Sequence, residues 1–144
     1  MKKAAIIIIT AISLSCHAPE RRTLCIFPST PVYYLRPDEV LARLRAIGIK
    51  YPTIVWRQVM LETGWGKSRL AVDGKNLFGM KHTERGWSLG WLWGHAHYAS
   101  FDDGISDYKE WQDRYYRGGD YYEFLRRIGY AEDEFYIDKL KQIR

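Results

Sequence analysis

Apolar residues first recur at helical spacing after Pro37. Between Pro37 and Gly48 they stand three or four positions apart, which places them on one face of a helix. Proline favours the first turn of a helix and glycine the position after its last turn, so both ends are marked. A second helix is predicted to begin at Pro52, to carry Glu62 at the end of its apolar face and to stop at Gly64.

Residues 75–101 lose the helical period, because glycines interrupt them repeatedly. Within this segment, residues 95–99 alternate in polarity as a β-strand does. We therefore expect a small β-hairpin here, with a mobile tip around residues 87–93.

Signals for the start of helices return after the hairpin. Ser100 with Asp103, and Asp120 with Glu123, have the spacing of capping boxes, and Asp133 is expected to cap a last helix. Helices, a small hairpin and further helices predict a mainly α-helical α+β fold. A chain of 144 residues has room for one such domain.

The first residues of the chain predict export. Lys2 and Lys3 precede an apolar run over residues 4–14, which is too short to span a membrane and is typical of a signal peptide. The small residues before Cys16 resemble the lipobox of bacterial lipoproteins, whose cysteine carries lipid and anchors the protein to a membrane. Cleavage after Ala18, which would give a soluble exported protein, is the alternative.

These signals divide the chain into three parts. Residues 1–18 are the expected signal peptide, which would end before Cys16 in a lipoprotein. Residues 19–31 hold prolines without periodicity and are expected to be a tether, and residues 32–144 form the folded domain. We expect the protein in the cell envelope, as a periplasmic or outer-membrane lipoprotein, or secreted.

Composition narrows the range of partners. The net charge is +5, but lysine and arginine do not interleave with aromatic residues in a stripe, which excludes nucleic acid. The chain holds 6 Trp and 11 Tyr, whose apolar faces and polar edges suit sugar rings. We expect a monomer without a cofactor.

Glu62 is the strongest candidate for chemistry. On an apolar helix face, partial desolvation disfavours the charged carboxylate and raises its pKa. A carboxylic acid with a raised pKa can protonate a glycosidic oxygen. Trp65, which stands between two glycines, offers a platform for a sugar. The alternative is a helix-end glutamate that pairs with Lys67 or Arg69.

Four blocks of sequence follow one another toward the C-terminus. They are Gln58 to Ser68, with Leu61-Glu62-Thr63-Gly64-Trp65-Gly66 at its centre, then Asn76 to Lys81, Tyr98 to Tyr108 and Gly129 to Leu140. In content and order they resemble the bacterial glucosaminidase family of peptidoglycan hydrolases, which includes flagellar hydrolases and autolysins.

The resemblance implies a lysozyme-like α+β fold and cleavage of the β-1,4 bond between N-acetylglucosamine and N-acetylmuramic acid. It implies that Glu62 is the catalytic acid, and it places Tyr130 near the cleaved bond, with core packing as the alternative for Tyr130. The expected substrate-binding residues are Trp65, Asn76, Phe78, Lys81, Tyr98 and Tyr108.

The chain departs from the family at one point. Many members place a second carboxylate on the hairpin, and between Lys81 and Tyr98 the only acid is Glu84. An inverting mechanism needs its two carboxyl groups about 6.5–9.5 Å apart. Because the 2-acetamido group of the substrate can replace the second acid, we expect a substrate-assisted reaction. In it Glu62 acts as acid and then as base, while Tyr130 holds the sugar or the water.

Other residues around the hairpin have open roles. His82, His95 and His97 have a spacing that permits zinc, but nothing else in the sequence supports a metal, and none is expected. The tryptophans of residues 87–93 either cover the glycan groove as a lid or pack the hairpin onto the helices.

Three other functions remain open. A muramidase or a lytic transglycosylase would share the fold and a single glutamate. A non-catalytic glycan-binding lipoprotein would keep the fold without the reaction.

Overall fold

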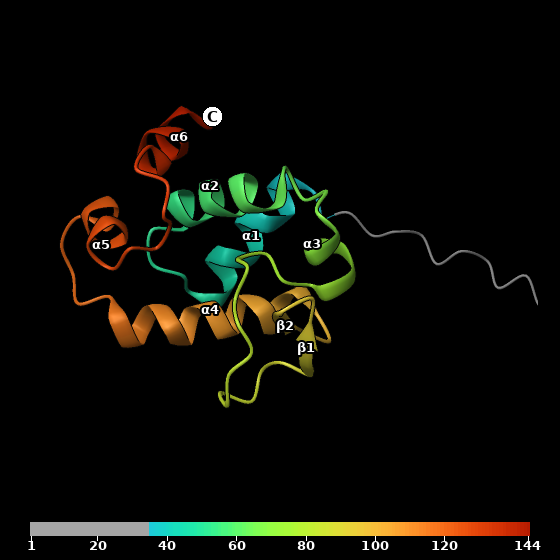
Figure 1. Ribbon diagram of the computed structural model, residues 1–144. Helices are drawn as coiled ribbons and strands as arrows, with labels where there is room; N and C mark the ends of the chain where they lie inside the picture. The colour runs from blue at the N-terminus through green and yellow to red at the C-terminus, as the bar shows by residue number, and fades with distance from the viewer. Residues whose placement is uncertain (1–34) are drawn as a thin grey trace, which may run out of the picture. The chain divides into compact units, whose positions relative to one another are not determined.

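Six helices and one antiparallel hairpin build residues 35–144, the part of the chain that the computed structural model describes (Figure 1). In chain order they are α1 (Pro37–Ile47), α2 (Pro52–Thr63), α3 (Arg69–Gly74), β1 (Gly90–Leu92), β2 (His95–His97), α4 (Phe101–Tyr115), α5 (Tyr121–Arg127) and α6 (Tyr136–Gln142). This confirms the mainly α-helical α+β fold. The expected signal peptide, Cys16 and the tether lie outside the described residues.

The first two helices begin and end where their proline and glycine signals predict. Gly48 follows α1 at φ 81° and Gly64 follows α2 at φ 55°, both in the left-handed region where glycine has no steric cost. α2 packs against α1 and α6, and α1 packs against α4. α2, which carries Glu62 in its last turn, is therefore held between helices from both halves of the chain.

The hairpin is tighter than the sequence predicts. Its turn consists of Trp93 and Gly94, at φ 49° and 75°, and two consecutive positive φ values are the signature of a two-residue type I′ turn. Trp91 lies within β1, and Trp87 lies before the hairpin begins. The prediction that residues 87–93 form the tip was therefore wrong: the tip is the turn at Trp93 and Gly94, and a tryptophan at positive φ gives no turn signal in the sequence.

Two of the three predicted N-caps are confirmed. Ser100 of α4 and Asp120 of α5 each accept a hydrogen bond from the backbone N–H three residues on, at 3.1 and 2.9 Å. The last helix begins later than predicted, at Tyr136 after the N-cap Phe135. Asp133 instead accepts the N–H of Phe135 at 2.9 Å, so it stabilises the turn before the helix.

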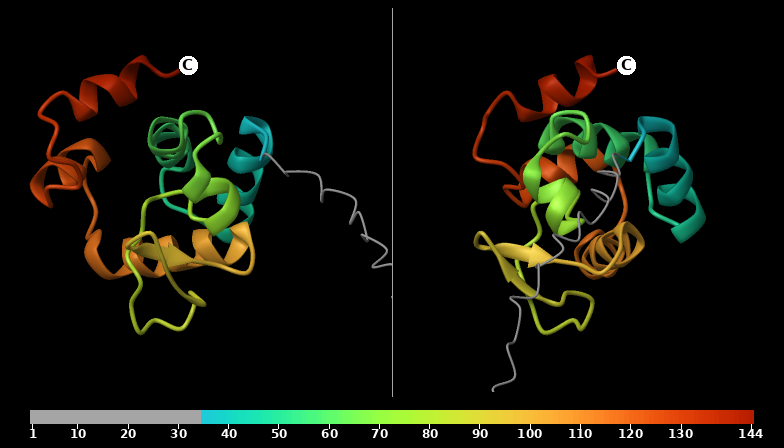
Figure 2. Two further views of the ribbon diagram at one scale, coloured as in Figure 1. Left: turned by 45° about the vertical axis from the view of Figure 1, so that its right-hand side comes forward. Right: turned by 90° about the vertical axis from the view of Figure 1, so that its right-hand side faces the viewer.

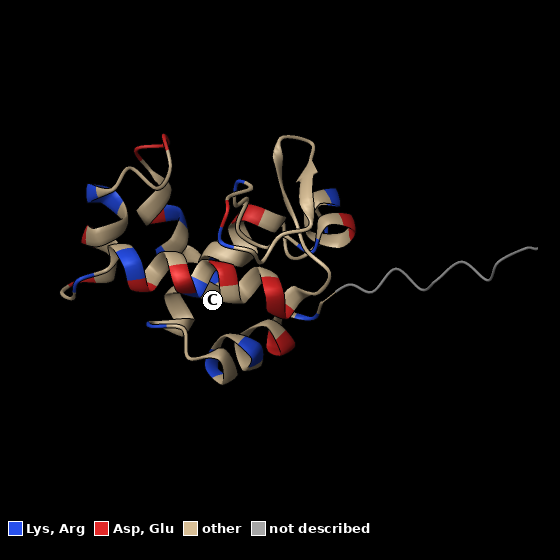
Figure 3. Ribbon diagram, turned by 90° about the horizontal axis from the view of Figure 1, so that it is seen from below, with Lys and Arg blue, Asp and Glu red and all other residues tan. Residues whose placement is uncertain are grey.

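The hairpin lies near the N-terminal end of α4, and α5 lies beyond the C-terminal end of α4 (Figures 1 and 2). The buried side chains of α4 join those of α1, α2, α5 and α6 in one core. Basic and acidic residues are interspersed along the helices (Figure 3). Within residues 35–144, no helix has both the length and the apolar character needed to cross a membrane.

Candidate active site

A cleft of about 580 Å³ opens at the end of α2. Its lining consists of Glu62, Phe78, Gly79, Met80, Lys81, Thr83, Arg85, His95, Trp111, Tyr115, Ile128, Gly129 and Tyr130. These residues come from α2, the segment before the hairpin, β2, α4 and the segment after α5. A concave site that mixes aromatic surface with a few polar groups is typical of a ligand-binding cleft.

Glu62 combines contact with solvent and partial desolvation. The residue is exposed on the cleft side, while its Oε1 accepts a hydrogen bond from the hydroxyl of Tyr136 at 3.0 Å. Burial of the carboxyl group by its surroundings raises its pKa above the ordinary 4.5, and the hydrogen bond from Tyr136 opposes that shift. The net pKa shift is upward, as a general acid requires.

A chain of hydrogen bonds, all buried except the partly buried last one, leads from the core to this carboxylate. From the core outward its members are Gln112, Tyr121, Tyr108, Gln58, Tyr136 and Glu62, joined at 2.8, 2.9, 3.0, 3.5 and 3.0 Å. Since Tyr108 donates to the carbonyl oxygen of Gln58, the hydroxyl of Tyr121 must donate to Tyr108. Every member therefore donates toward Glu62, and successive bonds of one direction polarise one another.

The structure brings four of the predicted site residues to the cleft, namely Glu62, Phe78, Lys81 and Tyr130. The Tyr130 ring meets Trp111 edge to face with centroids 5.7 Å apart. Its hydroxyl is 3.5 Å from the carbonyl oxygen of Phe78, a long hydrogen bond. Burial raises the pKa of Tyr130 well above 10.0, so its hydroxyl stays protonated and can donate to a ligand.

Trp65 and Asn76 are not in the lining of this cleft. Trp65 is 48% exposed and lines a different hollow with Leu35, Arg36, Pro37 and Lys67. Asn76 is buried, and its amide donates to the carbonyl oxygens of Met80 and Ala96 at 2.9 and 2.8 Å. Asn76 thus holds the segment that lines the cleft against β2 and does not line it.

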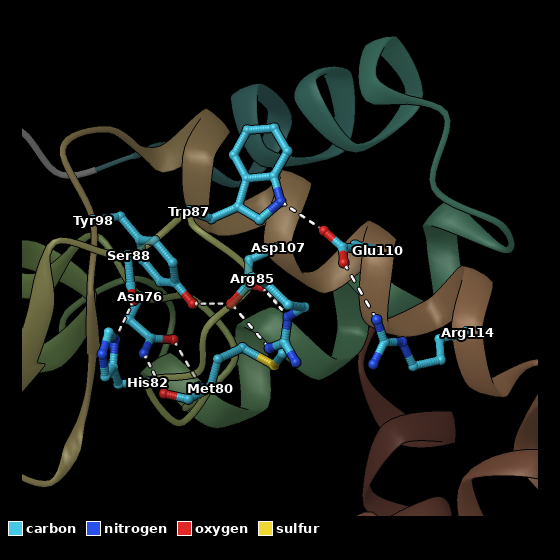
Figure 4. A network of polar contacts seen from close by, with 10 residues as sticks. All are labelled: Asn76, Met80, His82, Arg85, Trp87, Ser88, Tyr98, Asp107, Glu110 and Arg114. Atoms are coloured by element: carbon cyan, nitrogen blue, oxygen red, sulfur yellow. Dashed lines mark hydrogen bonds and ion pairs between the residues drawn. The ribbon is translucent and has the colours of Figure 1, made fainter.

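Tyr98 and Tyr108 are also buried outside the cleft. Tyr108 is a member of the hydrogen-bond chain behind Glu62. The hydroxyl of Tyr98 donates to Asp107 at 2.7 Å, and Asp107 in turn binds Arg85, which does line the cleft (Figure 4). Both tyrosines are connected to the site through one or more intervening side chains.

Glu84 is exposed and does not line the cleft. Among the lining residues within positions 35–144, Glu62 is the only carboxylate. The structure therefore does not bring a second acid beside the first in this conformation.

Three features of the site were missed in the sequence. Tyr136 stood within the block from Gly129 to Leu140, so that block could have indicated its contact with Glu62. Trp111 and Tyr115 recur at helical spacing in α4, which indicates a shared helix face but not that this face lines a cleft. Arg85 carries no sequence signal, because its role depends on Asp107, which lies 22 positions away.

The residues around the hairpin are held by separate contacts. Nδ1 of His82 lies 2.5 Å from the hydroxyl of Ser88, and Nδ1 of His95 donates to the carbonyl oxygen of Gly79 at 2.9 Å. No group of three or more His, Cys, Asp or Glu within the described residues could hold a metal ion. Trp87 donates to Glu110 of α4 at 3.0 Å, which ties the segment before the hairpin to that helix.

The cleft of this helical α+β domain holds one partly desolvated carboxylic acid, which is the group that protonation of a glycosidic oxygen needs. A family profile described as mannosyl-glycoprotein endo-beta-N-acetylglucosaminidase matches residues 39–144, a range that contains all four sequence blocks. The chain belongs to this glucosaminidase family and is a glycoside hydrolase.

Solved structures share the fold. The catalytic domain of the autolysin Auto from Listeria monocytogenes is 22% identical at a TM-score of 0.50, over 73% of this chain and 76% of that domain. A peptidoglycan hydrolase from Sphingomonas sp. A1 is 25% identical at a TM-score of 0.50, over 70% of this chain and 78% of that chain. A mutant peptidoglycan hydrolase from the same organism is 24% identical at a TM-score of 0.54, over 74% of this chain and 86% of that chain. A search of curated proteins finds no match.

Proposed function

We propose that this chain is an endo-β-N-acetylglucosaminidase of peptidoglycan, which cleaves the β-1,4 bond between N-acetylglucosamine and N-acetylmuramic acid. One observation carries the proposal: within the described residues, the cleft has a single carboxylate, Glu62, and burial raises its pKa. The similar solved structures, an autolysin and peptidoglycan hydrolases by their titles, support peptidoglycan as the substrate.

The proposed mechanism uses Glu62 twice. Protonated Glu62 gives its proton to the glycosidic oxygen, while the acetamido oxygen of N-acetylglucosamine bonds to the anomeric carbon and the muramic acid departs as the alcohol. Glu62, now charged, then takes a proton from the water that attacks the anomeric carbon. This attack opens the oxazolinium ring that the acetamido group had formed. The hydroxyl of Tyr136 stabilises the charged form between these steps.

The roles of the other residues follow their positions. Phe78 and Lys81 would contact the glycan directly, and Tyr130 would hold the sugar or the water through its protonated hydroxyl. Trp65 lies in a separate hollow, so any glycan contact there would be remote from the cleaved bond. Glu84 stays the candidate second acid only if residues 81–85 move on substrate binding.

Mass spectrometry of the fragments released from purified peptidoglycan tests the activity and its bond specificity together. We expect soluble fragments with N-acetylglucosamine at the new reducing ends, and none from Glu62→Gln. Reducing ends of N-acetylmuramic acid would assign a muramidase, and 1,6-anhydro ends a lytic transglycosylase. Binding of glycan without release of fragments would leave only the non-catalytic glycan-binding protein.

The parts of the chain before the described residues belong to the same proposal. Residues 1–18 would direct export, Cys16 would carry lipid, residues 19–31 would be the tether and residues 32–144 the catalytic domain, active as a monomer at the cell envelope. Labelling of cells with an alkyne fatty acid tests the anchor. Label on wild type and none on Cys16→Ala supports lipidation, whereas a soluble protein that begins after Ala18 contradicts it.

A further inference from the structure

Arg85 is held in the cleft by a partner from the core. Its Nε and Nη2 donate to the two carboxylate oxygens of Asp107, and the side chains of Arg85 and Asp107 are only 14% and 2% exposed. Tyr98 donates to the same carboxylate at 2.7 Å (Figure 4). Asp107 therefore fixes the guanidinium in place before any ligand arrives.

This arrangement leaves one edge of Arg85 available. The pair with Asp107 uses Nε and Nη2 as donors, and within residues 35–144 Nη1 donates no hydrogen bond. Since Arg85 lines the cleft, the free donors of the guanidinium can meet a ligand there. A rigid guanidinium with free donors suits a carboxylate in particular, because two N–H groups match its two oxygens.

The charge balance of the cleft also favours an anion. Lys81 and Arg85 line it as cations, and Asp107 behind Arg85 cancels one of them. Glu62 adds no charge in the protonated form that the acid step needs. The formal charges of Lys81, Arg85 and Asp107 then sum to +1. Glu110 also acts on Arg85 electrostatically but does not line the cleft, so the lining itself favours an anionic group on the substrate.

The segment that carries Arg85 is fixed to α4 at two points. Arg85 binds Asp107, and Trp87 binds Glu110, which lies three positions further along the same helix. Residues three apart lie on one face of a helix. The position of Arg85 is thus set by α4, the helix that also supplies Trp111 and Tyr115 to the cleft.

We propose that Arg85, held by Asp107 and Tyr98, is a specificity residue that binds a carboxylate of the glycan strand. The inference rests on the proposed function, because the strand supplies two sources of carboxylate. One is the lactyl carboxylate of a muramic acid that has lost its peptide. The other is the set of carboxylates on the stem peptide. This source applies where the peptide is still attached, because the lactyl group is then an uncharged amide.

Three substrates separate these sources. The first is glycan strands freed of peptide by an amidase, the second is the same strands with the lactyl carboxylate capped as a neutral methylamide, and the third is strands that keep their peptides. We expect wild type to show a KM at least about tenfold lower on the first than on the second, as a charge-assisted hydrogen bond provides. Preference for the third over both others assigns the contact to the peptide carboxylates.

Two variants test the residue itself. Arg85→Gln should remove the preference for charged strands, but it leaves the carboxylate of Asp107 buried beside a neutral partner and can unfold the protein. The double variant Arg85→Gln with Asp107→Asn removes both charges and keeps hydrogen-bonding groups at both positions. Arg126→Gln on α5, exposed and paired with Glu123, removes one positive charge outside the cleft and is the matched control.

The results distinguish the carboxylate site from the proposed function on which it rests. The carboxylate site is supported if the double variant loses the preference for charged strands while Arg126→Gln keeps it. Thermal melting checks that both variants are folded. Equal KM for all three substrates in wild type overturns the carboxylate site while the proposed function stands. A wild type that cuts none of them overturns the proposed function and this inference together.

Discussion

At the scale of single residues, the site depends on how Glu62 is surrounded. Burial raises the pKa of Glu62, and the hydrogen bond from Tyr136 lowers it again, although by less. The sequence predicted the first effect from the position of Glu62 on an apolar helix face. It could not predict the second, because Tyr136 lies 74 positions away.

Tyr136→Phe should extend activity toward alkaline pH. Glu62 must be protonated to act as an acid, so activity falls as the pH rises through its pKa, which lies above 4.5. The variant removes a donor that favours the charged form, so the pKa rises further and the alkaline limb of the kcat/KM profile moves to higher pH.

The pH profile needs a control for loss of a tyrosine hydroxyl. Tyr122→Phe removes one that binds Arg57, at 2.8 Å, and does not contact Glu62. Its limb should coincide with that of wild type. If the alkaline limb of the kcat/KM profile is unchanged in Tyr136→Phe, a group other than Glu62 controls the loss of activity at alkaline pH.

Glu84→Gln should retain most of the hydrolysis that Glu62→Gln abolishes. Glu84 is exposed and outside the cleft lining, and the acetamido group of the substrate replaces a second acid. Loss of one acid–base group costs about 100- to 10,000-fold in rate, so initial rates of fragment release distinguish the two variants easily. Equal loss in both would establish a two-carboxylate mechanism and remove the substrate-assisted one.

At the scale of elements, α4 organises the site. Its residues Asp107 and Glu110 bind the segment before the hairpin. Its residues Trp111 and Tyr115 line the cleft. Gly104 allows the close approach, because a Cβ there would lie 2.7 Å from the carbonyl oxygen of Lys75 and 3.1 Å from the ring of Tyr98. The sequence showed a glycine inside a predicted helix but not what lies against it.

Gly104→Ala should destabilise the protein, although the same change in a free helix stabilises by about 1 kcal/mol. The added methyl group meets backbone at a distance that real Cβ atoms do not adopt, so α4 must shift, at a cost of about 1–3 kcal/mol. Urea unfolding followed by circular dichroism measures the change. An increase in the free energy of unfolding would show that the packing of α4 is loose.

At the scale of the whole molecule, the chain of hydrogen bonds behind Glu62 connects α5, α4, α2 and α6. Gln58 occupies its centre, fully buried, between Tyr108 and Tyr136. Gln58 shares the buried face of α2 with Val55 and Val59, where a polar side chain needs partners. The partners themselves come from elements that only the complete fold brings together.

Gln58→Met should lower the free energy of unfolding by about 1–3 kcal/mol, because Tyr108 would lose its acceptor while it stays buried. Chemical denaturation measures this loss. Gln142→Met, at the exposed end of α6, is the matched control and should change stability by less than about 0.5 kcal/mol. Equal stability of both variants would mean that the buried chain contributes nothing net.

The sequence by itself determined the helical class, most helix boundaries, the glucosaminidase family and the place of Glu62. These features depend on local signals, such as proline, glycine, capping residues and apolar spacing, and on motifs that are contiguous in the chain. The tertiary structure decided which residues surround Glu62. Tyr136, Arg85 with Asp107, and the buried path through Gln58 join positions far apart in the chain, and no local pattern reports contacts across such distances.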